Sequence, residues 1–186
     1  SSVWKSLNAA DKDGLAKTLA AAGEKGVVAL GAVIEGTPEC AKFKDSLGKS
    51  LFANLGELVN QPLNPALRNV NPQQLLDQVL LQVANPDRIE QGNAPTCTVT
   101  SMQFELVRDD AAEYVRLLSG LASTSGSVEM AGGGKLKLVP DALDSLSKRE
   151  ASQALFQTAA MEYGNGGDTY DVKAGVSHDD QGVARD

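Results

Sequence analysis

Apolar residues spaced three or four positions apart constrain the fold of this chain more than any other feature. One stripe consists of Phe43, Leu47, Leu51, Leu55 and Val59. A second consists of Leu75, Leu76, Val79, Leu80 and Val83. Such spacing places each run on one face of an α-helix. Apolar residues make up 42% of the 186 residues, but aromatic residues only 4%, so we expect a helical core packed mainly from Leu, Val and Ala.

Capping residues followed by proline indicate where these helices begin and end. Thr37-Pro38 and Asn71-Pro72 each place a capping side chain before a proline at the first helical position. We therefore expect one helix from Pro38 to Gln61-Pro62 and another from Pro72 to Asn85-Pro86. Two earlier helices rich in Ala and Leu are expected over 11–22 and 25–34.

A further helix is expected to begin at Cys97. It would bury Val99, Met102 and Leu106 and end at Asp109-Asp110. An aspartate at that point also suits the N-terminus of another helix, which we expect over 111–121.

One hairpin and one last helix complete the predicted elements. Residues 128–139 alternate apolar and charged side chains around Gly132-Gly133-Gly134, which predicts a β-hairpin with a glycine turn. A final helix is expected over 148–163. The predicted fold class is therefore mainly α (α+β), a helical lobe with one β-hairpin.

Three segments follow from this pattern. Residues 1–85 form a helical extension or pro-segment-like scaffold, and 86–163 form the lobe with the Cys97 helix and the hairpin. Residues 164–186 are rich in Gly, Asp, Asn and Ser and are expected to be a flexible polar tail. Because the chain opens at Ser1 without Met and closes without a helix cap, we also expect a processed or truncated product.

Charge and composition exclude several classes of protein. With a net charge of −7 and no basic stripe, we expect no nucleic-acid partner. The longest apolar run, Val27–Ile34, is far shorter than the roughly 20 residues of a membrane span, so we expect no membrane partner. No His/Cys grouping has zinc-ligand spacing, and no cofactor or metal is expected.

The segment Gln91-Gly92-Asn93-Ala94-Pro95-Thr96-Cys97 carries the residues best suited to chemistry. At a helix N-terminus, the positive end of the helix dipole favours the Cys97 thiolate. The Cys97 N–H and the Gln91 side-chain amide are donors suited to a developing oxyanion. Gly92 permits a turn that a side chain would obstruct. This pattern indicates a thiol nucleophile.

Gln91, Gly92 and Cys97 resemble the Gln-Gly-x4-Cys motif of the papain-like cysteine peptidases, the calpain-type branch included. The resemblance implies the N-terminal lobe of that fold, with Cys97 as nucleophile and Gln91 as oxyanion donor. It implies a protein or peptide substrate and acyl transfer on an amide. Pro95 stands where the family usually has Gly, and Thr98 where an aromatic residue is common.

The family also requires a histidine, which usually lies about 130 to 150 residues after the cysteine. The chain has one histidine, His178. Three possibilities follow. His178 would fold back onto the site with Asp179 or Asp180 as its orienting partner, or the catalytic histidine would belong to a missing C-terminal half. In the third, the fold is used without catalysis. The alternatives to a thiol hydrolase are therefore a non-catalytic interaction domain and a secreted effector.

The second cysteine, Cys40, has no glutamine partner and is expected to pack as a small apolar residue. Secreted chains stapled by disulfides usually carry more cysteine at this length, which favours free thiols. The sequence does not decide whether Cys40 and Cys97 form a disulfide.

Overall fold

The computed structural model describes residues 2–92, 96–143 and 149–166, together with the backbone of three short strands nearer the C-terminus. The described part is mainly helical, as predicted. Its α-helices are α1 Ser2–Ser6, α2 Ala9–Ala21, α3 Glu24–Gly36, α4 Leu51–Asn60, α5 Pro72–Ala84, α6 Cys97–Asp109, α7 Ala111–Ala122 and α8 Ala151–Gly164. Its short 3-10 helices are η1 Pro38–Lys42, η2 Pro65–Leu67 and η3 Pro86–Arg88.

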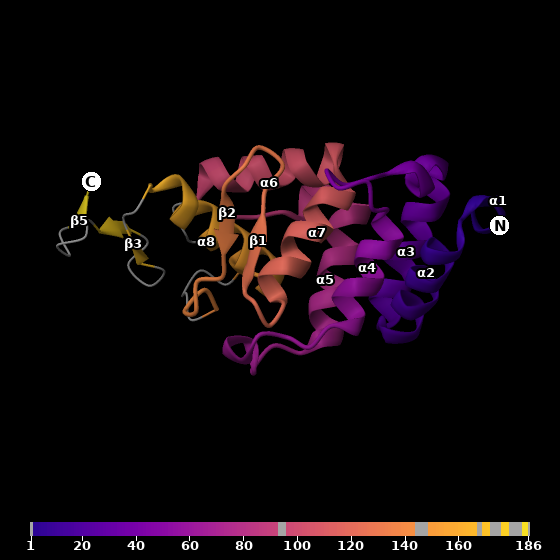
Figure 1. The fold of residues 1–186 in the computed structure, drawn as a ribbon, viewed down its shortest axis with the longest axis horizontal. Helices are drawn as coiled ribbons and strands as arrows, with labels where there is room; N and C mark the ends of the chain where they lie inside the picture. Colours follow the sequence, from indigo (N-terminus) through magenta and orange to yellow (C-terminus); the bar gives the residue numbers. More distant parts are fainter. Residues whose placement is uncertain are drawn as a thin grey trace.

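Helix α7 lies in the middle of the molecule, and every residue of it except Gly120 is buried. Helix α4 packs against α7, and α2 packs against α4 towards the N-terminal end (Figure 1). Helices α6 and α8 pack against α7 towards the other end, while α3 packs on α5. One apolar cluster therefore runs from Val3 to Ala159 and joins the segment 1–85 to the segment 86–163.

The predicted hairpin forms where the alternating pattern lies. Strand β1 (Ser127–Glu129) pairs antiparallel with β2 (Lys135–Lys137). In β2, Leu136 is buried between two exposed lysines. The turn closes with Gly133 and Gly134 at φ of 84° and 86°, a left-handed conformation that favours glycine. The triple glycine is thus a turn, as predicted.

The prediction of one continuous helix from Pro38 to Pro62 is wrong. The chain forms η1, then a loop, and α4 begins only at Leu51. Asp45 causes the break, because its carboxylate accepts hydrogen bonds from the backbone N–H groups of Leu47 and Lys49 at 2.9 and 2.8 Å. Such local bonds compete with helix formation. Leu47, predicted to be on the apolar face, is consequently 75% exposed.

Helix boundaries elsewhere follow the predicted caps. The Asn71 side chain accepts from Gln74 N at the start of α5, and the Asp110 side chain accepts from Glu113 N at the start of α7. Helix α3 is capped by a different helix, since the Asp77 carboxylate of α5 accepts from Gly23 N at 2.9 Å.

Helix α6 also differs from prediction in the face that it buries. Met102 was expected in the core but is 58% exposed. The buried residues are Val99, Gln103 and Val107, spaced by four. A glutamine thus takes the place in the core that the apolar pattern assigned to Met102.

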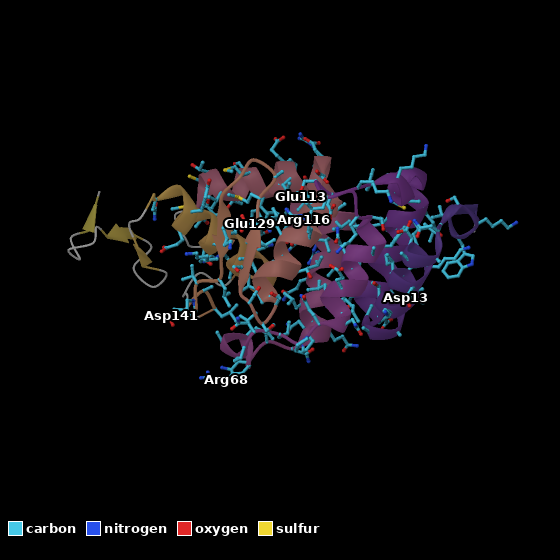
Figure 2. All side chains as sticks on the ribbon, viewed as in Figure 1. Asp13, Arg68, Glu113, Arg116, Glu129 and Asp141 are labelled. Carbon is cyan, nitrogen blue, oxygen red and sulfur yellow. The ribbon has the colours of Figure 1, made fainter. Side chains whose placement is uncertain are left out.

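A buried ion pair fixes the hairpin to α7. Arg116 donates to the Glu113 carboxylate at 2.9 and 2.6 Å, and also to the backbone oxygen of Glu129 in β1 at 2.8 Å. Figure 2 shows the three residues close together. Burial raises the pKa of Glu113, but hydrogen bonds from Arg116 and Ser46 outweigh it, so the pKa lies below its ordinary value.

Three short strands lie within the segment predicted to be a flexible polar tail. They are β3 Thr169–Asp171, β4 Val176–His178 and β5 Ala184–Arg185, and they pair antiparallel in the order β3-β4-β5. This small sheet lies beyond the C-terminal end of α8, at the opposite end of the molecule from α1 (Figure 1). The flexibility of the tail stays a prediction.

Candidate functional site

Cys97 is the first residue of α6, as predicted, and it is exposed. The residue before it, Thr96, is fully buried. The Thr96 side chain accepts no hydrogen bond from the first turn of α6, although threonine at this position commonly does so. The local chain therefore directs one side chain inward and the next one outward.

Gln91 and Gly92 lie on the segment that leads to α6. Gln91 is partly exposed, and Gly92 has a φ of 60°. That left-handed conformation explains why glycine suits this position. Residues 93–95, including Pro95, lie outside the described residues. The structure therefore places the two ends of the motif, Gln91-Gly92 and Thr96-Cys97.

A buried glutamine from α8 contacts the chain on both sides of the motif. Gln157 donates through Nε2 to the backbone oxygen of Glu90 at 3.1 Å. Its Oε1 accepts from the Thr96 hydroxyl at 3.0 Å and from Arg149 Nη1 at 3.0 Å. Gln157 is fully buried, so one amide group joins the residue before Gln91 to the residue before Cys97.

This amide belongs to a chain of buried polar groups that we call the amide network: Gln82, Gln103, Tyr114 and Gln157. Gln157 donates to Gln103 Oε1 at 3.0 Å, and Gln103 donates to the Tyr114 hydroxyl at 3.1 Å. Tyr114 donates to Gln82 Oε1 at 2.5 Å. Burial raises the pKa of Tyr114 above its ordinary value, so the hydroxyl keeps its proton and its role as a donor.

The other end of the network reaches the start of α8. Gln82 donates to Ser152 Oγ at 2.7 Å and to Glu150 Oε2 at 3.1 Å. In each amide of the network, the oxygen accepts a hydrogen bond and the NH₂ group donates one, as buried polar groups require. The amide network therefore joins α5, α6, α7 and α8 through hydrogen bonds.

A cleft of about 270 Å³ lies beside Gly92. Its lining is mostly charged or amide-bearing and consists of Asn85, Asp87, Arg88, Glu90, Gly92, Arg149, Glu150 and Gln153. Arg88 and Glu150 form an ion pair of 3.7 Å across it. This lining is more polar than that of a typical small-molecule pocket.

The two cysteines are both free thiols in different surroundings. Cys40 is fully buried, as its predicted packing role requires, and burial raises the pKa of its thiol. Cys97 is exposed. The disulfide that the sequence left open is therefore not formed in this structure.

The structure shows no contact between His178 and the described residues of the motif. Its backbone lies in β4, paired with Thr169 and Ala184, but its side chain lies outside the described residues, as do Asp179 and Asp180. No histidine occurs among the side chains that the structure describes, because His178 is the only histidine of the chain.

Two other classes of site are also absent from the described part of the chain. No group of three or more His, Cys, Asp or Glu side chains there is arranged to hold a metal ion. None of the helices in that part has the length and apolar character needed to cross a membrane.

Comparison with protein families, curated proteins and solved structures gives no match to this chain. The resemblance to papain-like peptidases therefore depends on Gln91, Gly92 and Cys97 alone.

Sequence reasoning did not identify Gln157 or the amide network. A signal was present, because Gln103 occurs midway between Val99 and Val107 on a helical face, and Gln153 and Gln157 share a face of α8 with Ala154 and Leu155 nearby. Polar residues within an apolar stripe indicate buried hydrogen bonds. Which partners they find is decided by the packing of four helices, α5, α6, α7 and α8.

Proposed function

We propose that this protein is a thiol hydrolase that uses Cys97 as the nucleophile in acyl transfer on an amide of a protein or peptide. The observation that carries the proposal is an exposed cysteine at the first position of α6, preceded by a buried threonine. Reactive cysteines need both access to substrate and a surrounding that favours the thiolate.

The reaction proceeds in two steps. The Cys97 sulfur attacks the amide carbonyl carbon, the C–N bond breaks, and the amine leaves with a proton from a general acid. Water then attacks the resulting thioester, loses a proton to the same group, and Cys97 leaves as the thiolate. In each step the Gln91 amide and the Cys97 N–H donate to the negatively charged oxygen.

The general acid in this chain would be His178, oriented by Asp179 or Asp180. The alternative source is a histidine from outside this chain. His178→Ala separates the two: hydrolysis by the unaltered chain that disappears in this variant assigns the role to His178. Hydrolysis that persists in this variant removes His178 from the mechanism.

Cysteine alkylation tests the nucleophile directly. Iodoacetamide labelling across about pH 5 to 8, located by peptide mass, should modify Cys97 rapidly below about pH 7. Cys40 is the internal control and should label slowly because it is buried. Cleavage of an unfolded protein substrate should disappear in Cys97→Ala and persist in Cys40→Ala.

Cys97 labelling no faster than that of an exposed cysteine in an unstructured peptide, together with no cleavage of any substrate, would contradict the proposal. That result would favour the alternative of a non-catalytic interaction domain. Full cleavage by Cys97→Ala would also contradict it.

A further inference from the structure

We propose that Gln157 is a positioning residue that holds Glu90 and Thr96, the residues directly before Gln91 and Cys97, in the arrangement where Cys97 is reactive. The inference rests on the proposed function of Cys97. Gln157 itself touches neither substrate nor the reacting atoms, since its role is exerted through Glu90 and Thr96.

The geometry points to Gln157 because its contacts lie on both sides of the motif. Glu90 O, at 3.1 Å from Nε2, directly precedes Gln91. The Thr96 hydroxyl, at 3.0 Å from Oε1, directly precedes Cys97. The two contacts are made by opposite ends of one planar amide, so the relative position of the two flanks is fixed by a rigid group.

The orientation of this amide is determined by its partners. A backbone carbonyl only accepts a hydrogen bond, so the group facing Glu90 O must be the NH₂ group of Gln157. A guanidinium only donates, so the group facing Arg149 Nη1, at 3.0 Å, must be Oε1. A rotated amide would oppose donor to donor and acceptor to acceptor, which is costly in a buried site.

The contact with Gln157 also explains the unusual start of α6. Because the Thr96 hydroxyl donates to Gln157 Oε1, the Thr96 side chain is turned into the core instead of capping its own helix. Thr96 is fully buried and Cys97 exposed. The hydrogen bond that turns Thr96 into the core thus directs the next side chain, Cys97, towards solvent.

A pair of variants at Thr96 gives the sharpest test. Thr96→Val keeps the shape of the side chain and removes the hydroxyl that reaches Gln157, whereas Thr96→Ser keeps the hydroxyl. Thr100→Val is the matched control, because the Thr100 hydroxyl donates to the Thr96 backbone oxygen at 2.8 Å and lies 3.3 Å from the Thr96 hydroxyl but has no bond to Gln157. The measurement is the rate of Cys97 alkylation by iodoacetamide at about pH 6 relative to about pH 9.

A second pair of variants tests the glutamine itself. Gln157→Leu removes both contacts with the motif. Gln61→Leu is its control, since Gln61 also donates through Nε2 to a backbone oxygen of another helix, that of Ser119 at 2.7 Å, but lies outside the motif and its cleft. Circular dichroism confirms that each variant is folded, and the Thr96 pair decides the outcome if Gln157→Leu does not fold.

We expect Thr96→Val and Gln157→Leu to lower the acid-side labelling of Cys97 by about tenfold, since small displacements at a reactive group have effects of this size or larger. Thr96→Ser and both controls should stay within about twofold of the unaltered protein. Amide hydrogen exchange over 89–100 should become faster in the same two variants, because the segment loses its anchors.

The outcomes separate this inference from the proposed function. Rapid acid-side labelling of Cys97 that is unchanged in Thr96→Val and Gln157→Leu would overturn the role of Gln157 and leave the nucleophile intact. Equal losses in the controls would also overturn it, because general loosening would then explain the effect. Slow labelling in the unaltered protein would overturn the proposed function and with it this inference.

Discussion

The contact between α2 and α4 and the contact among α5, α6, α7 and α8 both lie in the core, but they are built from opposite kinds of residue. At the first, two glycines face each other, and a Cβ on Gly56 would lie 2.6 Å from the Cα of Gly14. At the second, the amides of Gln82, Gln103 and Gln157 meet through directional hydrogen bonds.

The two contacts fix different properties of the fold. Close glycine packing sets the distance between two helix backbones through van der Waals contact, which has no preferred partner atom. Hydrogen-bonded amides specify which donor atom faces which acceptor atom. A buried amide group that is left unpaired costs considerable free energy. Glu90 and Thr96, which precede Gln91 and Cys97, are bonded to the second kind of contact, where orientation is specified.

The largest effect on stability is expected from a methyl group at the glycine contact. In Gly14→Ala the new Cβ would overlap the Phe52 carbonyl, with the carbonyl carbon 2.7 Å away. Because both groups belong to helix backbones, the helices must separate, and we expect a loss of about 3 kcal/mol in the free energy of unfolding. Urea denaturation measures it.

Gly31→Ala is the matched control for this substitution. Gly31 also lies inside a helix, but no atom would lie within 4 Å of its new Cβ. We expect a gain of about 0.5 to 1 kcal/mol from the better helix propensity of alanine. Equal effects of the two substitutions would show that the glycine contact is not the cause.

A smaller effect is expected from the amide network. Gln103→Leu removes the acceptor for one Gln157 N–H and the donor to Tyr114. We expect a loss of about 2 kcal/mol, because leucine fills the volume but leaves buried polar groups unpaired. The neighbouring substitution Met102→Leu, at an exposed position, should change the unfolding free energy by less than about 0.5 kcal/mol.

The Tyr114 hydroxyl should contribute less again. Tyr114→Phe keeps the edge-to-face packing on Phe156, whose ring centroid lies 5.7 Å away, and removes only the hydroxyl between Gln82 and Gln103. We expect a loss of about 1 kcal/mol. Combined with Gln103→Leu, the loss should be smaller than the sum, since the two groups share one hydrogen bond. Strict additivity in the double-mutant cycle would argue against a connected network.

The last comparison concerns how the free energy of unfolding depends on pH. The pKa of Glu113 is below its ordinary value of 4.5 in the folded protein, so the carboxylate stabilises the fold fully above that value. The contribution is lost as the pH falls through the lower folded pKa. The difference in unfolding free energy between the protein and Glu113→Gln should therefore shrink from pH 7 towards pH 3.

Asp110 provides a contrast of opposite sign in the same experiment. Burial raises the pKa of Asp110 in the folded protein. Protonation of Asp110 on acidification therefore does not lower the free energy of unfolding, whereas protonation of Glu113 does. A difference between the protein and Glu113→Gln that grows on acidification would contradict the assignment of Glu113 as the stabilising carboxylate.

Local signals in the sequence predicted most of the helix boundaries. Asn71 and Asp110 cap the helices that they were expected to cap, and Cys97 begins its helix. The glycine turn of the hairpin was also predicted. These features depend on bonds within a few residues, so neighbours in sequence suffice to determine them.

The errors occurred where several signals competed. The stripe through Phe43 and Leu47 suggested a helix, but the Asp45 side chain and Gly48, with a φ of 81°, form a turn there. Helical spacing alone does not show whether an apolar residue meets a partner. Met102 lies on the exposed side of α6, while Gln103 meets Tyr114 and Gln157 in the core.

The sequence by itself determined the helical class, the hairpin and a cysteine at a helix start, because each depends on the spacing of residues and on local capping bonds. Only the tertiary structure decided that Gln157 joins Glu90 to Thr96 across the motif. Gln157 is distant from both in the chain, and an amide gains its role only when packed helices bring a matching donor and acceptor to it.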